Sequence, residues 1–160
     1  IETVEVFFAN NQILFRSEHI SFYTRLLEGN YPDTDRLIPT EFNTEATFNV
    51  ANLRFAMERA RLLSNATQNG TVKLEFKNGV VSSHVHSPEV GRVNEEIDTS
   101  AVSGEDLSIS FNPTYLIEAL KAIDSEQVVI RFISSVRPFT LVPEGNEQGF
   151  IQLITPVRTN

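Results

Sequence analysis

Two histidines, His84 and His86, stand two residues apart in a stretch that alternates polar and apolar residues. In a β-strand such a spacing directs both imidazoles to one face, where they could bind a metal ion together. A stable zinc site needs at least three protein ligands, and no third ligand is evident nearby. The pattern therefore favours an exposed polar strand face, and we expect no metal site.

Other residue types that could perform catalysis are isolated or explained by local structure. Asp33 and Asp35 could form a carboxylate pair, but Asp33 follows Gly29-Asn30-Tyr31-Pro32, a run of turn-forming residues. His19 stands alone, and the sequence contains no G-x-S-x-G, P-loop, G-x-G-x-x-G or H-E-x-x-H motif. We expect no catalytic residue, no cofactor and no enzymatic activity. A small metal-dependent hydrolase using His84 and His86 stays the weakest alternative.

The balance of charged residues indicates whether the protein could bind nucleic acids by electrostatic attraction. The 160 residues include 13 Lys+Arg and 21 Asp+Glu, which gives a net charge of −8. Proteins gain affinity for nucleic acids largely by neutralising phosphates with basic groups. The composition therefore argues against a conventional DNA-binding domain, unless basic residues gather locally or the mechanism does not depend on affinity.

The composition also indicates the cellular compartment in which we expect the protein. The absence of cysteine excludes disulfides and thiolate metal sites. No apolar run approaches the roughly 20 residues that cross a bilayer, and residues 1–5 lack the features of a signal peptide. We expect a soluble, cytoplasmic protein without a membrane partner.

An internal repeat indicates how the chain is organised. Phe48, Asn49 and Leu53 recur 63 positions later as Phe111, Asn112 and Leu116. In each copy a short strand ends at Phe, and Asn is placed to cap the following helix. Pro113, at the first helical position of the second copy, strengthens that prediction.

Hydrophobic periodicity extends the repeat to a β-α-β-β-β unit present twice. The expected fold class is α+β, with two helices packed on antiparallel sheets. The predicted helices are Val50–Ser64 and Pro113–Ile123. The predicted strands after them are Thr71–Phe76, Val80–His86, Val93–Ile97, Val128–Ile133, Pro138–Val142 and Phe150–Ile154, with a hairpin turn at Asn78-Gly79.

The first part of the chain has a different pattern. Thr3–Phe8, Ile13–Arg16 and Ile20–Arg25 alternate as strands with no helix beside them. Three such strands do not close a core, so they are expected to belong to a domain whose other elements are missing. We expect residues 1–37 to hold these strands and a connector, and residues 38–160 to form a complete domain.

Four motifs are spread along nearly the whole chain: Arg-Leu-Leu-Glu-Gly-Asn-Tyr-Pro-Asp at residues 25–33, Leu-Leu-Ser-Asn at residues 62–65, Phe-Asn-Pro-Thr-Tyr-Leu at residues 111–116 and Pro-Val-Arg at residues 156–158. Together they resemble motifs of the bacterial DNA polymerase III beta subunit family, the beta sliding clamps. The first resembles that family's connector between its middle and last domains, and the others are similar to its helix-ending L-L-S-N, its F-N-x-x-Y-L and its P-M/V-R ending. The sequence is most similar in character to Gram-positive, streptococcus- or enterococcus-like members.

The resemblance implies a fold and a function. In this family each subunit has three domains of two β-α-β-β-β units, and two subunits form a head-to-tail ring around duplex DNA. Residues 1–37 would be the last strands of the middle domain with its connector, and residues 38–160 the C-terminal clamp domain. The implied function is a non-catalytic processivity factor that forms a homodimer at full length and slides on duplex DNA without reading its sequence. A peptide-binding adaptor without DNA contact stays the alternative.

The resemblance also implies protein partners that bind through short linear motifs. These are the replicative polymerase alpha subunit, the clamp loader delta subunit, translesion polymerases and mismatch-repair proteins. Their motifs would enter an apolar groove. The matching groove residues are Pro32, Arg36, Leu37, Asn112, Tyr115, Val136, Pro138, Leu153, Ile154, Thr155, Pro156, Val157 and Arg158. Without the resemblance, Leu153, Ile154 and Val136 would be interpreted as ordinary strand residues.

Two further sets of residues follow from the resemblance. Arg54, Arg59, Arg61 and Lys121 would face DNA, although the sequence alone favours ordinary solvated helix positions for them. Leu62, Leu63, Glu89 and Glu95 match residues of the ring interface. A core position is an equally good interpretation of Leu63.

Overall fold

The computed structural model describes residues 3–65, 70–88, 91–145 and 149–158. The chain separates into two compact units, Ile1–Asp35 and Arg36–Asn160, each of which is described by itself. A short 3-10 helix, Thr34–Arg36, spans the boundary. In the described ranges, no helix is long and apolar enough to cross a membrane.

The first unit is an antiparallel sheet of three strands, β1 (Glu5–Phe8), β2 (Gln12–Arg16) and β3 (Ser21–Arg25), in the order β1-β2-β3. Its register pairs Phe7 with Leu14 and Leu14 with Tyr23. None of the described residues 3–35 is buried. The sheet therefore has no core of its own, as the predicted strands implied.

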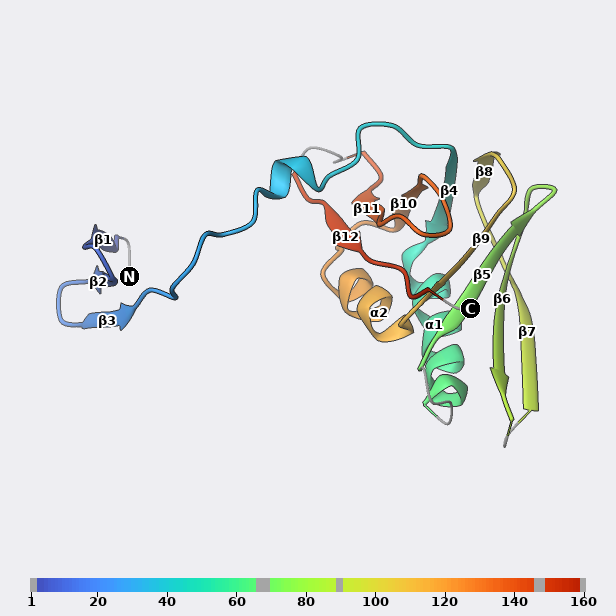
Figure 1. Cartoon of the computed structure of the whole chain (residues 1–160), viewed down its shortest axis with the longest axis horizontal. Coiled ribbons are helices and arrows are strands. Elements are labelled where there is room, and N and C mark those ends of the chain that lie inside the picture. The colour runs from blue at the N-terminus through green and yellow to red at the C-terminus, as the bar shows by residue number, and fades with distance from the viewer. Residues whose placement is uncertain (1–2, 66–69, 89–90, 146–148, 159–160) are drawn as a thin grey trace. The chain divides into compact units, whose positions relative to one another are not determined.

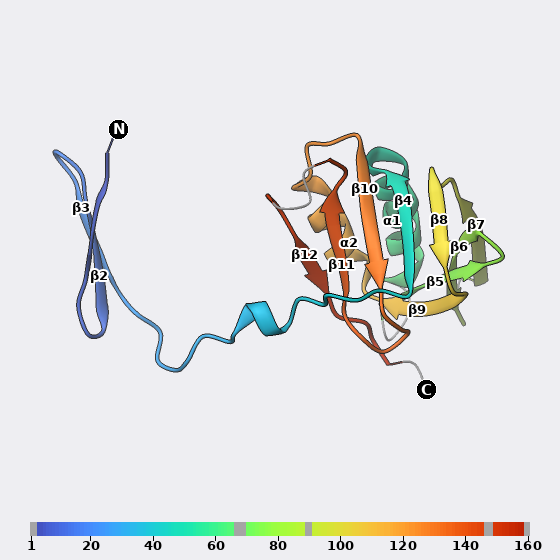
Figure 2. The same cartoon turned by 90° about the horizontal axis from the view of Figure 1, so that it is seen from above.

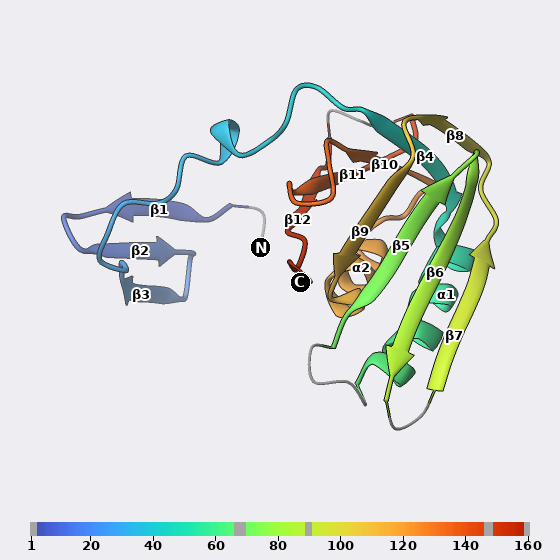
Figure 3. The same cartoon turned by 45° about the vertical axis from the view of Figure 1, so that its right-hand side comes forward.

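The described part of the second unit contains two α-helices and two antiparallel sheets, which confirms the predicted α+β fold. One sheet has the strand order β12-β11-β10-β4-β8 and the other β7-β6-β5-β9. Figure 2 shows the first sheet, and Figure 3 shows the second with α1 and α2 on one side of it. The elements are β4 (Thr44–Asn49), α1 (Val50–Ser64), β5 (Val72–Lys77), β6 (Val80–Ser87), β7 (Gly91–Ile97), β8 (Ala101–Gly104), β9 (Leu107–Phe111), α2 (Pro113–Lys121), β10 (Gln127–Phe132), β11 (Phe139–Pro143) and β12 (Gln152–Ile154).

The predicted duplication appears in the strand pairing. The strand before each helix pairs with the strand after the other helix, so that Phe48 of β4 lies opposite Val128 of β10 and Phe111 of β9 lies opposite Val72 of β5. The two helices pack against each other between these exchanged strands (Figure 1). The two repeats therefore form one interlocked domain.

Asparagine caps begin both helices, as the sequence predicted. The side-chain oxygen of Asn49 accepts a hydrogen bond from the Asn52 backbone N–H at 3.0 Å, and that of Asn112 accepts one from Thr114 at 2.9 Å. Each bond satisfies one of the N–H groups that a helix leaves unpaired at its start.

The core lies between the sheets and the helices. Phe76, Phe111, Phe132 and Phe139 form a chain of aromatic contacts, with successive ring centroids 4.9–5.1 Å apart. Each of these side chains is at most 2 % exposed. Large aromatic side chains contribute much of the apolar area that a domain of this size buries.

The structure corrects several element boundaries. Strand β8 was not predicted, because Ala101-Val102-Ser103-Gly104 is short and has no alternating apolar pattern. Helix α2 ends at Lys121 instead of Ile123, since Ala122 and Ile123 donate backbone hydrogen bonds three residues back. Strand β12 begins at Gln152, two residues after the predicted start. The predicted Asn78-Gly79 turn is confirmed, with positive φ at both residues.

Candidate functional site

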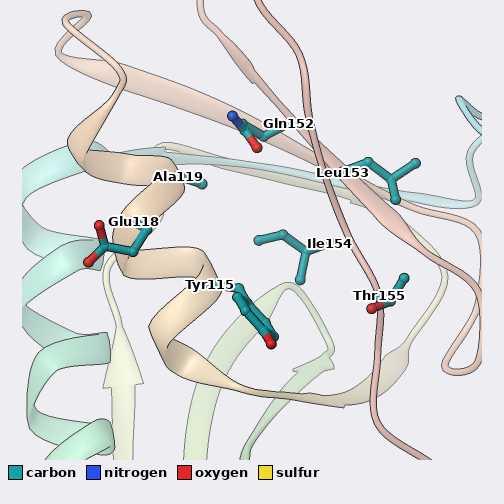
Figure 4. A pocket seen from close by; sticks show the side chains of 7 residues that line it. All are labelled: Tyr115, Glu118, Ala119, Gln152, Leu153, Ile154 and Thr155. Carbon is teal, nitrogen blue, oxygen red and sulfur yellow. The ribbon is translucent and has the colours of Figure 1, made fainter. Parts of the chain in front are cut away.

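The side chains of α2 and β12 form a shallow pocket, called here the tail pocket. Its volume is about 380 Å³. Figure 4 shows Tyr115 of α2 facing Ile154 of β12, with Leu153 directed to the other side of the strand. Tyr115 is 60 % exposed, whereas Ile154 is buried. The lining residues are Tyr115, Glu118, Ala119, Gln152, Leu153, Ile154 and Thr155.

Asn112 and Pro113 explain why Tyr115 stands at this place. The Asn112 cap fixes the first turn of α2, and buried Pro113 occupies its first helical position. Tyr115 follows on the exposed side of that turn. The structure thus gives the predicted groove residue Asn112 a positioning role, because its side-chain oxygen is used by the helix.

A second hollow, the linker pocket, lies where residues 36–41 pass the loop after β10. Its volume is about 620 Å³. Three predicted groove residues, Arg36, Leu37 and Pro138, line it. Leu37 is 57 % exposed, so it offers apolar surface at this pocket.

A third hollow, the cationic pocket, lies beside the C-terminal tail, with a volume of about 400 Å³. It is held together by the backbone N–H of Val157, which donates to the Ser110 carbonyl at 2.7 Å. Its lining residues are Lys73, Ser108, Ser110, Ser135, Val136, Val157 and Arg158.

The three pockets adjoin along the chain. The tail leads from Thr155 of the tail pocket through Pro156 to Val157 of the cationic pocket, and the loop after β10 leads from Val136 to Pro138 of the linker pocket. Of the predicted groove residues, Pro32 belongs to the first unit and is exposed there. Most of the predicted groove residues thus line one of three separate hollows, which are connected along the chain.

Some lining residues were missed by the sequence analysis. Glu118 and Ala119 follow Tyr115 by three and four positions, the spacing that places side chains on one helix face. That signal was available in the sequence. Lys73 was not accessible to such reasoning, because it reaches its pocket only through the pairing of β5 with β9.

The basic helix residues form mostly intramolecular contacts. Arg54 lies 3.8 Å from Glu58, and its guanidinium stands over the Phe55 ring at 5.3 Å from the centroid. Lys121 contacts Glu118 at 2.9 Å. Within the described ranges, Arg61 has no ion pair.

Arg59 connects α1 to β7. Its Nε donates to Glu95 Oε2 at 3.2 Å, and its Nη2 donates to Glu95 Oε1. This hydrogen bonding raises the pKa of the Arg59 guanidinium above its ordinary value, against a smaller lowering by desolvation. Glu95, one of the residues predicted for the ring interface, thus forms hydrogen bonds within its own chain.

The other residues predicted for the ring interface differ in environment. Leu62 is 72 % exposed, whereas Leu63 packs against the core. Glu89 lies outside the described residues.

The histidine pair lies on the outer polar face of the sheet β7-β6-β5-β9. His84 lies within 2.8 Å of both the Ser82 hydroxyl and the Asn94 side-chain oxygen, and 3.6 Å from Glu75. His86 is exposed. The part of the chain that the structure describes contains no group of three or more His, Cys, Asp or Glu placed to bind a metal ion.

The described domain is duplicated, its repeats exchange strands, its two helices pack against each other, and its C-terminal tail lines pockets. This is the fold of a DNA-clamp domain, and comparisons with solved structures support this. The crystal structure of the DNA polymerase III beta chain from Streptococcus pneumoniae aligns with a TM-score of 0.92 and 79 % identity, over 98 % of this chain and 41 % of that one. The beta subunit from Streptococcus pyogenes aligns with a TM-score of 0.89 and 72 % identity, over 98 % of this chain and 42 % of that one.

Sequence comparisons agree. The family described as "DNA polymerase III beta subunit, C-terminal domain" matches residues 35–158. The chain is 80 % identical over its whole length to the beta sliding clamp of S. pneumoniae and 56 % identical, over 99 % of its length, to that of Lactococcus lactis. It spans 42 % of the length of each of these curated relatives. The chain belongs to the DNA polymerase III beta subunit family.

Proposed function

We propose that this chain is the C-terminal clamp domain, with the end of the preceding domain, of a sliding clamp. In the assembled protein, two subunits would form a cytoplasmic ring that encircles duplex DNA and tethers the replicative polymerase. The chain itself would perform no catalysis. The match of residues 35–158 to the family carries this proposal.

The division of the chain follows from the same proposal. Residues 1–37 would be the last strands of the middle clamp domain and the connector, and residues 38–160 the last domain. The absence of any buried residue among the described residues 3–35 supports this assignment, because a sheet without a core needs further elements to cover it.

The helices would face the DNA. Helix α1 carries three arginines against one glutamate, although the chain as a whole has a charge of −8. Partial pairing of these cations with Glu58 and Glu95 would limit their attraction to phosphates. A ring retains DNA by topology, so weak contacts would allow it to slide.

The pockets would bind linear motifs of partner proteins. Exposed Tyr115, Leu37 and Val136 provide apolar surfaces for aliphatic and aromatic anchors, and the polar groups beside them would set orientation. We expect the polymerase alpha subunit, the clamp loader delta subunit, translesion polymerases and mismatch-repair proteins to use this groove.

The ring interface would form at β7 and the end of α1. Strand β7 is an outer strand of its sheet, so its outer backbone groups are free to pair with another strand. Exposed Leu62 would add an apolar contact there. Leu63 would instead support the fold.

The test uses this sequence in a protein of its relatives' full length, loaded onto nicked circular DNA by a clamp loader. We expect retention on the circle at high salt and loss after the DNA is linearised. Leu62→Ala should weaken dimerisation about 10-fold or more, because truncation of a buried anchor costs roughly 1.5–3 kcal/mol. Val80→Ala, an exposed valine at the β5–β6 hairpin, is the control.

The adaptor alternative predicts a different result. A protein that binds peptides but never encircles DNA would be retained on neither DNA form and would still bind partner motifs. Salt-sensitive binding that is equal on circles and linear DNA would contradict both hypotheses, because it would indicate affinity without topology.

A further inference from the structure

The cationic pocket has no assigned role. Lys73 and Arg158 contribute its positive charges, and none of the described residues that line it carries a carboxylate. In a chain with a charge of −8, a hollow lined by two cations and no acid differs from the average surface. Its three serine side chains, Ser108, Ser110 and Ser135, could donate hydrogen bonds to an anion.

The sheet register builds this pocket. Lys73 of β5 lies opposite Ser110 of β9, so both side chains stand on the same face of the sheet. The tail crosses beside them, because the Val157 N–H is bonded to the Ser110 carbonyl. Arg158 is thereby held next to the residues of β9. The pocket is thus formed by four separate segments, which are β5, β9, the loop after β10 and the C-terminal tail.

The polar groups of the pocket are available to a ligand. Within the described ranges, the hydroxyls of the three serines form no hydrogen bond with a protein group, and Arg158 has no ion pair. Lys73 Nζ lies 3.5 Å from Glu75, longer than the 2.7–2.9 Å typical of a strong charge-assisted hydrogen bond. Glu75 also lies 3.6 Å from His84, so it does not serve Lys73 alone.

The position of the pocket separates it from the proposed DNA surface. Val72 and Leu74 are buried on the side of β5 that faces the helices, and Lys73 between them is directed to the opposite side. Its apolar wall consists of Val136 and Val157, which belong to the predicted peptide groove. A ligand that combines an anionic group with apolar anchors therefore fits this pocket and its apolar wall better than a nucleic acid does.

We propose that the cationic pocket is an acidic subsite of the peptide groove, which selects linear motifs carrying an Asp or Glu side chain beside their apolar anchors. This inference rests on the proposed peptide-binding function. Lys73 and Arg158 attract the carboxylate, and the serine hydroxyls donate hydrogen bonds to it. The subsite adds specificity to anchors that bind in the tail and linker pockets.

The experiment compares three labelled peptides by fluorescence anisotropy with the 160-residue chain. All contain Gln, Leu and a Leu-Phe end; one has two Glu residues before these anchors, one has two Glu residues after them, and one has Gln at both places. We expect one acidic peptide to bind about 3- to 10-fold more tightly than the Gln peptide, as for partly exposed charge pairs. Raising the salt concentration should reduce this ratio.

Variants assign the effect to the pocket. Lys73→Gln should reduce the affinity ratio to below about 2-fold, and Lys73→Gln with Arg158→Gln should abolish it. Lys77→Gln is the matched control, since it removes the same charge from the same strand and face roughly 13 Å away. The ratio should persist in that variant. A truncation after Ile154, which removes Val157 and Arg158, should weaken all three peptides.

The outcomes separate this inference from the proposed function. Equal binding of all three peptides would overturn the acidic subsite and leave the groove standing. Equal loss of the ratio in Lys77→Gln and Lys73→Gln would also overturn it, because the effect would then be general electrostatics. Failure of every peptide to bind would overturn the groove and the subsite together.

Discussion

The two repeats of the second unit share their interior and differ in their surfaces. Phe48 and Phe111 are both fully buried, and Asn49 and Asn112 both cap the helix that follows. On the outside, α1 presents Phe55 and Leu62, whereas α2 presents Tyr115 next to the tail pocket. The duplication therefore preserves what the shared core and the caps require. The exposed positions are free to serve different contacts.

The sharpest test of the shared interior is truncation of the paired phenylalanines. Phe48→Ala and Phe111→Ala should each lower the free energy of unfolding by about 3–5 kcal/mol, because each leaves a cavity in a packed core. Urea denaturation monitored by circular dichroism would measure both, and Phe55→Ala, at a half-exposed position, should cost less than about 1 kcal/mol. If the alanine variants do not fold, Phe48→Leu and Phe111→Leu provide the same comparison at lower cost. Losses that differ by more than about 2 kcal/mol would show that the repeats are not equivalent.

The helix caps should show a smaller effect. Asn49→Ala and Asn112→Ala should each cost about 0.5–2 kcal/mol, because each leaves a helix N–H without its partner. Asn49→Asp and Asn112→Asp retain the acceptor and should stay near the wild-type stability. Thermal unfolding would measure all four. Unchanged stability in both alanine variants would contradict the role that the two hydrogen bonds indicate.

The smallest expected effect concerns a contact that only the first repeat makes, between Arg59 of α1 and Glu95 of β7. This pair is partly exposed, so a double-mutant cycle with Arg59→Gln and Glu95→Gln should give a coupling of about 0.2–1 kcal/mol. Arg61→Gln is the control, because Arg61 has no ion pair in the described part of the chain.

The pH dependence of that contact follows from the sign of the pKa shift. Because the bond to Glu95 raises the pKa of Arg59, the arginine's contribution to stability is fully present below the ordinary pKa of arginine and is lost only as the pH rises through the raised pKa. The coupling should therefore stay constant from roughly pH 6 to 10, where arginine remains charged. A coupling that fell within this range would contradict the assignment to Arg59.

The sequence predicted the helices and turns accurately where their formation depends on residues close together in the chain. The bounds of α1, Val50–Ser64, agree with the prediction, because the Asn49 cap and the apolar periodicity lie within one segment. The Asn78-Gly79 turn was predictable for the same reason, since its positive φ values suit these two residues. Strand β8 was missed because it is held by its pairing with β4, and not by any pattern of its own.

The sequence by itself determined the composition, the repeat, the caps and the resemblance to the clamp family, since each depends on residue types and short spacings. Only the tertiary structure decided how the repeats exchange strands, and that Leu62 is exposed while Leu63 packs against the core. Only the tertiary structure placed Lys73 and Arg158 in one pocket, because these two residues are 85 positions apart in the chain (73 and 158). The physical reason is that strand register and tail docking depend on long-range backbone hydrogen bonds and on burial, which no local spacing encodes.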